Sequence, residues 1–259
     1  MRHARHLLIV AVLVSLPVAV WFGVRGVDPG VADGSVEDEG KVEVRGAATA
    51  ANVPAPVEYT VCLQPLGEHD ATLTGPIGRG IAQAYGFGVR TLPARPLPAS
   101  AWYPARSRHR ADALLEHLLF DVLPETPGCH AVLGLTGVDI SATRGEHLDW
   151  GVLGLAFFGQ RVAVVSSYRL RAGVDGPGAA TRAVKVAIHE LGHVVGIPHR
   201  DDGAACVMND AVGAVATIDK ATGTLCAGER ADAERFLGRR LPGGDGIDWD
   251  LVLGLRAGS

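Results

Sequence analysis

This sequence lacks a large excess of either positive or negative charge. Its 259 residues include 24 Lys and Arg against 28 Asp and Glu, which leaves a formal net charge of −4. Since nucleic-acid-binding domains carry clustered basic charge, the sequence predicts no nucleic-acid partner. Aromatic residues are also scarce, at 5% of the chain, which reflects a bias of composition rather than a function. No internal repeats are found, and about two hundred residues follow the N-terminal segments, enough for one sizeable domain with its own core.

One long apolar run lies close to the N-terminus. Residues 7–24 carry no charged side chain, the preceding residues 1–6 include Arg2 and Arg5, and acidic residues follow from Asp28 onward. Basic residues before the run and acidic residues after it predict that residues 1–6 stay in the cytoplasm and that the rest is exported.

The same run predicts a single-pass protein of the cell membrane. Its 18 residues are at the short end of the roughly 17–25 that a membrane-spanning helix needs. No clear small-x-small cleavage site follows, and we therefore interpret residues 7–24 as an uncleaved transmembrane signal anchor. The alternative is a cleaved signal peptide, which would release a secreted protein.

The remaining chain divides into three parts. Residues 25–55 are rich in Gly, Ala, Val and charge without sustained periodicity, and they predict a flexible linker. The main domain is expected over residues 56–240, followed by a C-terminal tail over residues 241–259. Apolar periodicity and turn residues predict strands at 57–63, 131–136, 152–158 and 162–167, and helices at 76–85, 111–122, around 184–195 and at 231–237.

The most informative segment reads H-E-L-G-H-V-V-G-I-P-H, from His189 to His199. His189 and His193 are four residues apart, so on an α-helix both imidazoles project from one face and can bind one Zn²⁺ at roughly 2.0–2.1 Å. Gly196 can adopt the positive φ that ends the helix, and Pro198 prevents the helix from restarting. The chain can then turn back and bring His199 to the metal as a third ligand.

Three nitrogen ligands leave the fourth position of a tetrahedral zinc open for water, as in catalytic rather than structural sites. Glu190 is placed to take a proton from that water. Apolar residues recur at helical spacing on the opposite face and predict a half-buried helix: Val184, Ile188, Leu191 and Val195. The full pattern, H-E-x-x-H-x-x-G-x-x-H, is the metzincin signature and is far more specific than H-E-x-x-H alone.

The residues after the histidine motif narrow the family. Cys206, Val207 and Met208 form a Cys-x-Met, and Cys226 follows after residues 209–225. This arrangement resembles the archaemetzincins, whose motif continues past the third histidine with a Cys, then Cys-x-Met, and closes with Cys-x-x-Cys. The resemblance extends over roughly residues 97–240. It implies that Met208 is the Met-turn residue, whose thioether forms an apolar floor beneath the metal site.

The sequence departs from that family at two positions. In archaemetzincins four cysteines hold a second, structural zinc, but here Arg200 and Glu229 stand at the first and last of these positions. Two thiolates are too few for a closed tetrahedral site. We therefore expect one catalytic zinc per chain and no second zinc.

The four cysteines of the chain are expected to form two disulfides. Four cysteines allow three pairings. The resemblance implies a bond between Cys206 and Cys226, which would fasten the loop that the second zinc holds in the family, and this leaves Cys62 with Cys129. Four free thiols in a cytosolic enzyme are the alternative, and the predicted export argues against it.

The resemblance also implies a fold and an activity. The fold is an α/β (α+β) zincin domain of metzincin type, with a twisted mixed sheet, an active-site helix and a C-terminal helix. The activity is that of a zinc metallopeptidase acting on peptides or proteins, here outside the cytoplasm, with Glu190 activating the zinc-bound water.

One strand of a metzincin sheet forms the upper rim of the cleft, and the substrate lies antiparallel to it. That rim is expected here at Gly151, Val152, Leu153, Gly154 and Leu155. The alternative function is a non-catalytic module of the cell envelope, in which zinc stabilises the fold and the cleft binds a peptide or partner. An intact Glu190 argues against this alternative, because a binding protein needs no base.

Overall fold

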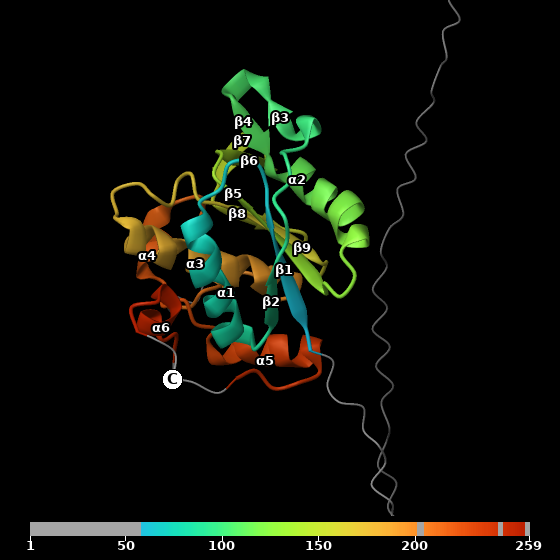
Figure 1. The fold of residues 1–259 in the computed structure, drawn as a ribbon. Helices are drawn as coiled ribbons and strands as arrows, with labels where there is room; N and C mark the ends of the chain where they lie inside the picture. The colour runs from blue at the N-terminus through green and yellow to red at the C-terminus, as the bar shows by residue number, and fades with distance from the viewer. Residues whose placement is uncertain (1–57, 201–204, 243–245, 257–259) are drawn as a thin grey trace, which may run out of the picture. The chain divides into compact units, whose positions relative to one another are not determined.

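Five strands form the main sheet, in the order β2-β1-β5-β9-β8 (Figure 1). Four of them run parallel: β1 (Thr60–Pro65), β2 (Gly88–Thr91), β5 (Ala131–Thr136) and β9 (Val162–Ser166). The fifth strand, β8 (Gly154–Ala156), lies antiparallel to β9 and forms one edge. β5 and β9 are buried along their whole length, as expected for parallel strands covered on both faces. The mixed α/β class that was expected is therefore confirmed.

The structure, a computed structural model, describes residues 58–200, 205–242 and 246–256. These residues belong to one unit that spans residues 54–259. Within the described ranges, no helix combines the length and apolar character needed to cross a membrane. The predicted membrane segment at 7–24 and the predicted linker at 25–55 lie outside the described residues, and both stay predictions.

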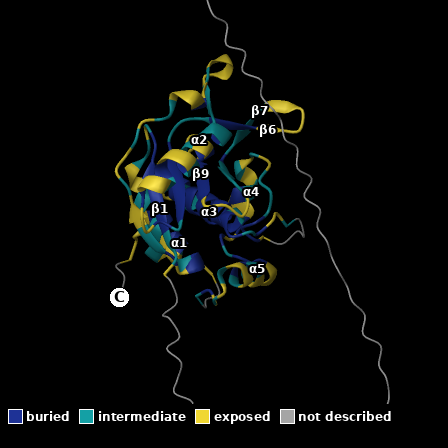
Figure 2. Ribbon diagram, turned by 90° about the vertical axis from the view of Figure 1, so that its right-hand side faces the viewer, coloured by how far each residue is buried: buried dark blue, intermediate teal, exposed yellow. Residues whose placement is uncertain are grey.

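Helices cover both faces of the main sheet. α1 (Ala71–Tyr85) and α3 (Gly176–Val194) pack on one face, and α2 (Ala111–His117) packs on the other. Successive residues of a strand point to opposite faces, so in β5 Leu133 joins the core under α1 and α3 whereas Val132 joins the core under α2. Figure 2 shows β9 and α3 as the buried centre of this three-layer arrangement.

A second, smaller sheet precedes the edge strand β8. Its order is β3-β4-β6-β7, with β3 (Trp102–Tyr103), β4 (Arg108–Arg110), β6 (Ile140–Arg144) and β7 (His147–Val152). β6 and β7 form an antiparallel hairpin, and β7 leads through one residue into β8. The position of the edge strand β8 is thus linked to the position of this second sheet.

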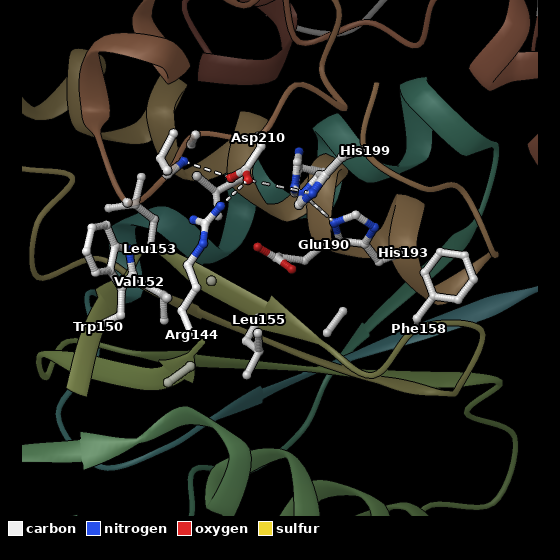
Figure 3. Close-up of a pocket in the computed structure, with 18 of the residues that line it drawn as sticks. Arg144, Trp150, Val152, Leu153, Leu155, Phe158, Glu190, His193, His199 and Asp210 are labelled. Carbon is white, nitrogen blue, oxygen red and sulfur yellow. Dashed lines mark hydrogen bonds and ion pairs between the residues drawn. The ribbon is translucent and has the colours of Figure 1, made fainter. Parts of the chain in front are cut away.

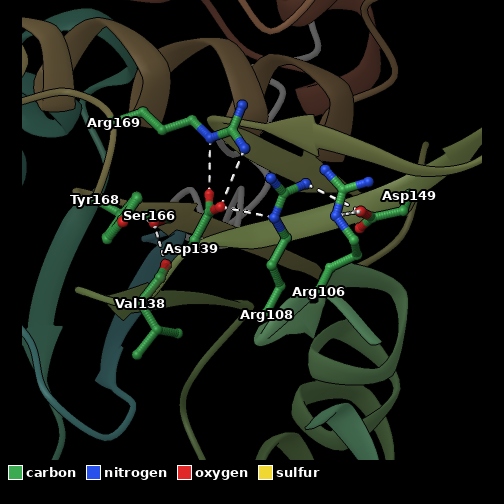
Figure 4. Close-up of polar contacts among 8 residues, drawn as sticks. All are labelled: Arg106, Arg108, Val138, Asp139, Asp149, Ser166, Tyr168 and Arg169. Carbon is green, nitrogen blue, oxygen red and sulfur yellow. Dashed lines mark hydrogen bonds and ion pairs between the residues drawn. The ribbon is translucent and has the colours of Figure 1, made fainter. Parts of the chain in front are cut away.

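A chain of alternating arginines and carboxylates fastens the second sheet to the turn after β9 (Figure 4). Arg169 binds Asp139 at 2.7 Å, and Arg108 binds both Asp139 at 2.9 Å and Asp149 at 3.2 Å. The Arg169 guanidinium also lies against Gly151, where an added Cβ would clash with it. Because these groups come from β4, from β7, from the residue before β6 and from the turn after β9, the network fixes the β6–β7 hairpin that leads into the edge strand β8.

Three short helices complete the described chain: α4 (Val215–Lys220), α5 (Ala227–Leu237) and α6 (Trp249–Leu253). α6 lies within residues 241–259, which were expected to be a tail. It packs against α1 and α3, and Arg79 of α1 donates a hydrogen bond to the carbonyl of Val252 at 2.8 Å. This segment therefore contributes to the core.

The predicted elements exist, but several boundaries differ. The helix predicted at 76–85 begins at Ala71, because Asp70 caps it by accepting a hydrogen bond from the Thr72 amide. The helix predicted at 111–122 is continuous, although α2 passes into a π-helical turn at Leu118–Val122. The strand predicted at 152–158 is divided between β7 and β8, and only β8 pairs with β9.

Candidate active site

α3 delivers two of the three histidines, and the turn after it delivers the third. The helix starts where the Asp175 carboxylate accepts a hydrogen bond from the Gly178 amide at 2.8 Å. It ends where Gly196 adopts a φ of 76°, a backbone conformation that glycine adopts without strain. The chain then reverses and places His199 beside the helix face.

The three imidazoles meet at one point. The Nε2 atoms of His189 and His199 are 3.1 Å apart, those of His193 and His189 are 3.1 Å apart, and those of His193 and His199 are 3.0 Å apart. The Nδ1 atom of His189 lies 2.7 Å from the Val207 carbonyl, and that of His193 lies 2.8 Å from the Ile197 carbonyl. A carbonyl can only accept, so both Nδ1 atoms carry the proton and both Nε2 atoms present a lone pair.

The charge state of these histidines suits a metal. Burial lowers the pKa of His189 to about 3, with the neighbouring charge of His193 as a further cause, and burial also lowers the pKa of His193. Both rings are therefore neutral at physiological pH. Converging lone pairs repel one another unless a cation lies between them, and zinc accepts imidazole nitrogen in tetrahedral sites. The residues present fit a zinc ion held by His189, His193 and His199.

Glu190 lies beside these histidines and over the edge strand β8 (Figure 3). Its side chain is buried, and its Oε1 atom would lie 2.5 Å from a Cβ added at Gly154 of β8. A glycine at that position therefore leaves the space that the carboxylate occupies. Burial raises the pKa of Glu190 to about 8, and the negative charge of Asp210 contributes in the same direction. A cation at the histidines would favour the ionised carboxylate.

Met208 lies against α3 between the two helical histidines. Its side chain is fully buried, and an added Cβ at Gly192 would clash with its sulfur. The neighbouring Val207 is the residue whose carbonyl orients His189. Met208 therefore packs on α3 at Gly192, and the residue before it supports a ligand, whereas its role as the Met-turn residue stays a prediction.

A cavity of about 490 Å³ opens over the histidines and Glu190. Four of the five expected rim residues line it: Val152, Leu153, Gly154 and Leu155. The fifth, Gly151, is not among the lining residues and lies against Arg169 instead. Only Gly154 and Leu155 belong to the edge strand β8, because β7 ends at Val152.

Sequence reasoning missed several residues that line this cavity. Arg144, Trp150 and Phe158 project into it, and the Arg144 guanidinium binds the Asp210 carboxylate at 2.6 Å (Figure 3). The same Asp210 oxygen lies 4.0 Å from His199 Nδ1. Hydrogen bonds from the Val212 amide and the Arg144 guanidinium hold the pKa of Asp210 below its usual value. No local motif marks Arg144, which reaches the site only through the β6–β7 hairpin.

Comparison with known proteins identifies the family, although no family model matches the chain. An archaemetzincin of Methanocaldococcus jannaschii is 30% identical over 154 residues, which cover 58% of this chain and 79% of that protein. An archaemetzincin of Pyrococcus furiosus is 30% identical over 159 residues, covering 58% and 79%. The chain belongs to the archaemetzincin family. It is therefore a zinc metallopeptidase.

Solved archaemetzincins share its fold. The Methanopyrus kandleri protein aligns with a TM-score of 0.60 and 29% identity, over 72% of this chain and 99% of that one. The Archaeoglobus fulgidus protein, crystallised in complex with malonate, aligns with a TM-score of 0.56 and 26% identity, over 67% and 99%. The expected resemblance to archaemetzincins is thus confirmed in both sequence and structure.

This archaemetzincin differs at the place where its relatives were expected to hold a second zinc. Cys206 and Cys226 are joined in a disulfide. Glu229 is fully buried, and its carboxylate accepts a hydrogen bond from the Cys226 amide at 2.8 Å at the start of α5. Arg200 binds the Asp232 carboxylate on the same helix. Glu229 thus caps the start of α5, and Arg200 forms an ion pair with the same helix.

The other two cysteines are also joined. Cys62 of β1 bonds to Cys129, which lies two residues before the start of β5, and both lie on the α2 side of the sheet. The described part of the chain has no free cysteine. This is the pair that remained once the family resemblance implied a bond between Cys206 and Cys226.

Proposed function

We infer that this archaemetzincin hydrolyses peptide bonds with one zinc ion held by His189, His193 and His199 and with Glu190 as the base. The observation that carries this inference is the convergence of three Nε2 atoms within 3.1 Å of one another. Zinc, when bound there, supplies a Lewis acid that polarises a carbonyl and lowers the pKa of a water ligand towards about 7.

The protein groups around the three histidines have separate roles in the reaction. Glu190 accepts the proton of the attacking water and returns it to the leaving amine, since its carboxylate faces the cavity beside the histidines. β8 has an unpaired edge and can hold the substrate main chain by antiparallel pairing. The carbonyls of Val207 and Ile197 keep two of the ligands in the required tautomer.

We further propose that the enzyme acts outside the cytoplasm. The basic, apolar and acidic succession over the first 39 residues supports export, as a membrane-anchored protein or, after cleavage, a secreted one. Two disulfides support the same location, because such bonds persist in oxidising compartments.

A panel of internally quenched peptides tests the proposed activity. We expect turnover by the zinc-loaded protein, and we expect a zinc chelator to abolish it and added zinc to restore it. The matched control is His193→Ala, which removes a ligand and should stay inactive when zinc is restored. Saturable peptide binding without turnover would contradict the proposal and support a non-catalytic binding module.

A further inference from the structure

The cleft is closed at one end. The segment Asp210–Gly213, which follows Met208, lies against β7: an added Cβ at Gly213 would lie 2.6 Å from the Gly151 carbonyl oxygen and 3.3 Å from Trp150 Nε1. The Arg144–Asp210 ion pair joins the same two segments at 2.6 Å. Both contacts connect the part of the molecule above the cleft with the part below it, so an extended chain cannot pass that point without displacing them.

The direction of β8 shows which half of a substrate meets the closed end. β8 runs from Gly154 to Ala156, and a substrate paired antiparallel to it runs the opposite way. Substrate residues after the scissile bond therefore lie toward Trp150 and Arg144, and those before it lie toward Phe158. Figure 3 shows Arg144 and Trp150 on one side of Glu190 and Phe158 on the other side, beyond His193. The closed end is the end that receives the C-terminal part of the substrate.

The closed end also carries the Arg144 guanidinium, paired with Asp210, at a short distance from the histidines. Asp210 Oδ2 lies 2.6 Å from the Arg144 guanidinium and 4.0 Å from His199 Nδ1. The distance from the guanidinium to His199 Nδ1 is therefore no greater than the length of two residues of an extended chain, at about 3.3 Å per residue. A guanidinium can bind a carboxylate through two parallel hydrogen bonds, and its side chain here is 46% exposed, so that a ligand can reach it.

The walls between Glu190 and Arg144 are mostly apolar. They include Leu153 of the rim, Val186 of α3, Ala211 and Ile218. A cavity with apolar walls and a guanidinium at its closed end is complementary to a side chain such as Leu that is followed by a carboxylate, provided that this carboxylate replaces Asp210 on the guanidinium.

We propose that this archaemetzincin is a carboxypeptidase that removes one or two residues from peptides ending in an apolar residue, with Arg144 binding the terminal carboxylate. This proposal rests on the proposed peptidase activity. In the reaction the peptide C–N bond breaks and a C–O bond forms to the water oxygen. Glu190 carries the proton of that water to the leaving amine. The terminal carboxylate exchanges for Asp210 on the guanidinium and takes no part in bond cleavage.

Matched peptides that end in Leu test the proposal on the full-length, zinc-loaded protein. One peptide has a free C-terminal carboxylate and the other is amidated. We expect kcat/KM to be about 10- to 100-fold higher for the free acid, as the loss of one charge-assisted hydrogen bond predicts, and mass spectrometry to find one or two residues released. Equal rates for both peptides, or cleavage of long peptides at internal bonds, would overturn the proposal.

Variants of Arg144 test whether the preference for a free C-terminal carboxylate depends on this residue. Arg144→Met should reduce the ratio of free-acid to amide rates towards one, and Arg144→Lys should restore part of it. The control is Arg95→Met, which also removes a surface arginine from an ion pair, 2.8 Å from Glu125, but lies after β2 near the opposite edge of the sheet. An unchanged ratio in Arg144→Met would remove Arg144 as the carboxylate receptor.

A binding measurement separates failure of this proposal from failure of the peptidase activity. Calorimetry on zinc-loaded Glu190→Gln should show tighter binding of an Ala-Leu dipeptide as the free acid than as the amide, and Arg144→Met should abolish the difference. If no peptide is cleaved but this difference is found, the proposed hydrolysis fails and the carboxylate site stands. If peptides are cleaved without any difference in binding, the carboxylate site fails and the peptidase stands.

Discussion

Replacement of Glu190 by Gln is expected to lower kcat for peptide cleavage by about 10²- to 10⁴-fold, the usual contribution of a general base, while zinc stays bound. The carboxylate is buried beside three histidines and fits into the space above Gly154. Gln has nearly the same shape, so it fills that space without disturbing His189, but it cannot accept a proton. Steady-state kinetics together with metal analysis of the same sample measures both quantities.

The control for this substitution is Glu125→Gln, which makes the same chemical change at a surface carboxylate with 63% exposure. It should leave both kcat and zinc content unchanged. Cleavage that survives in Glu190→Gln at an undiminished rate would remove this residue as the base. Loss of zinc in that variant would mean that Glu190 acts through the metal site rather than on the proton.

Removal of the Cys206–Cys226 disulfide should cost both stability and zinc affinity. The bond closes a loop of 20 residues, and loop-closure entropy predicts a loss of about 3 kcal/mol in the free energy of unfolding. Val207, the next residue, also provides the carbonyl that accepts from His189 Nδ1. Loosening this segment removes the group that fixes a ligand, and such losses weaken metal binding by about 10- to 100-fold. Denaturant unfolding and zinc titration of Cys206→Ala/Cys226→Ala measure the two effects.

The other disulfide provides a matched control. Cys62→Ala/Cys129→Ala opens a loop of 67 residues and should cost about 4 kcal/mol of stability, but its cysteines lie on the α2 side of the sheet, away from the histidines. As long as this double variant is folded, its zinc affinity should therefore equal that of the unaltered protein. Equal zinc affinity in both double variants would contradict a link between the Cys206–Cys226 bond and the metal site.

The metal-binding part of the site could be predicted because it is local in sequence. His189, Glu190 and His193 share one helix, and a single turn at Gly196 brings back His199. Helical periodicity and the conformational freedom of glycine fix these four side chains relative to one another almost independently of the rest of the fold.

The closed end of the cleft could not be predicted in this way. Arg144 reaches Asp210 only because the β6–β7 hairpin reverses at Gly145 with a φ of 57° and because the second sheet is fixed to the turn after β9. β7 is half exposed along its length and carries no strong alternation of apolar residues, so periodicity gave no signal for it. The contact between Arg144 and Asp210 depends on tertiary packing between segments that lie 66 residues apart in the sequence.

Zinc content per chain, measured on the full-length oxidised protein beside His199→Ala, tests whether the three histidines bind the metal. We expect one zinc per chain, held by three histidines, and a clear loss of that zinc in the variant, because only two imidazoles remain. Two zinc ions per chain would contradict it, since Cys206 and Cys226 would then be ligands rather than disulfide partners. Zinc retained in full by His199→Ala would equally contradict it, because the converging histidines would not be the site.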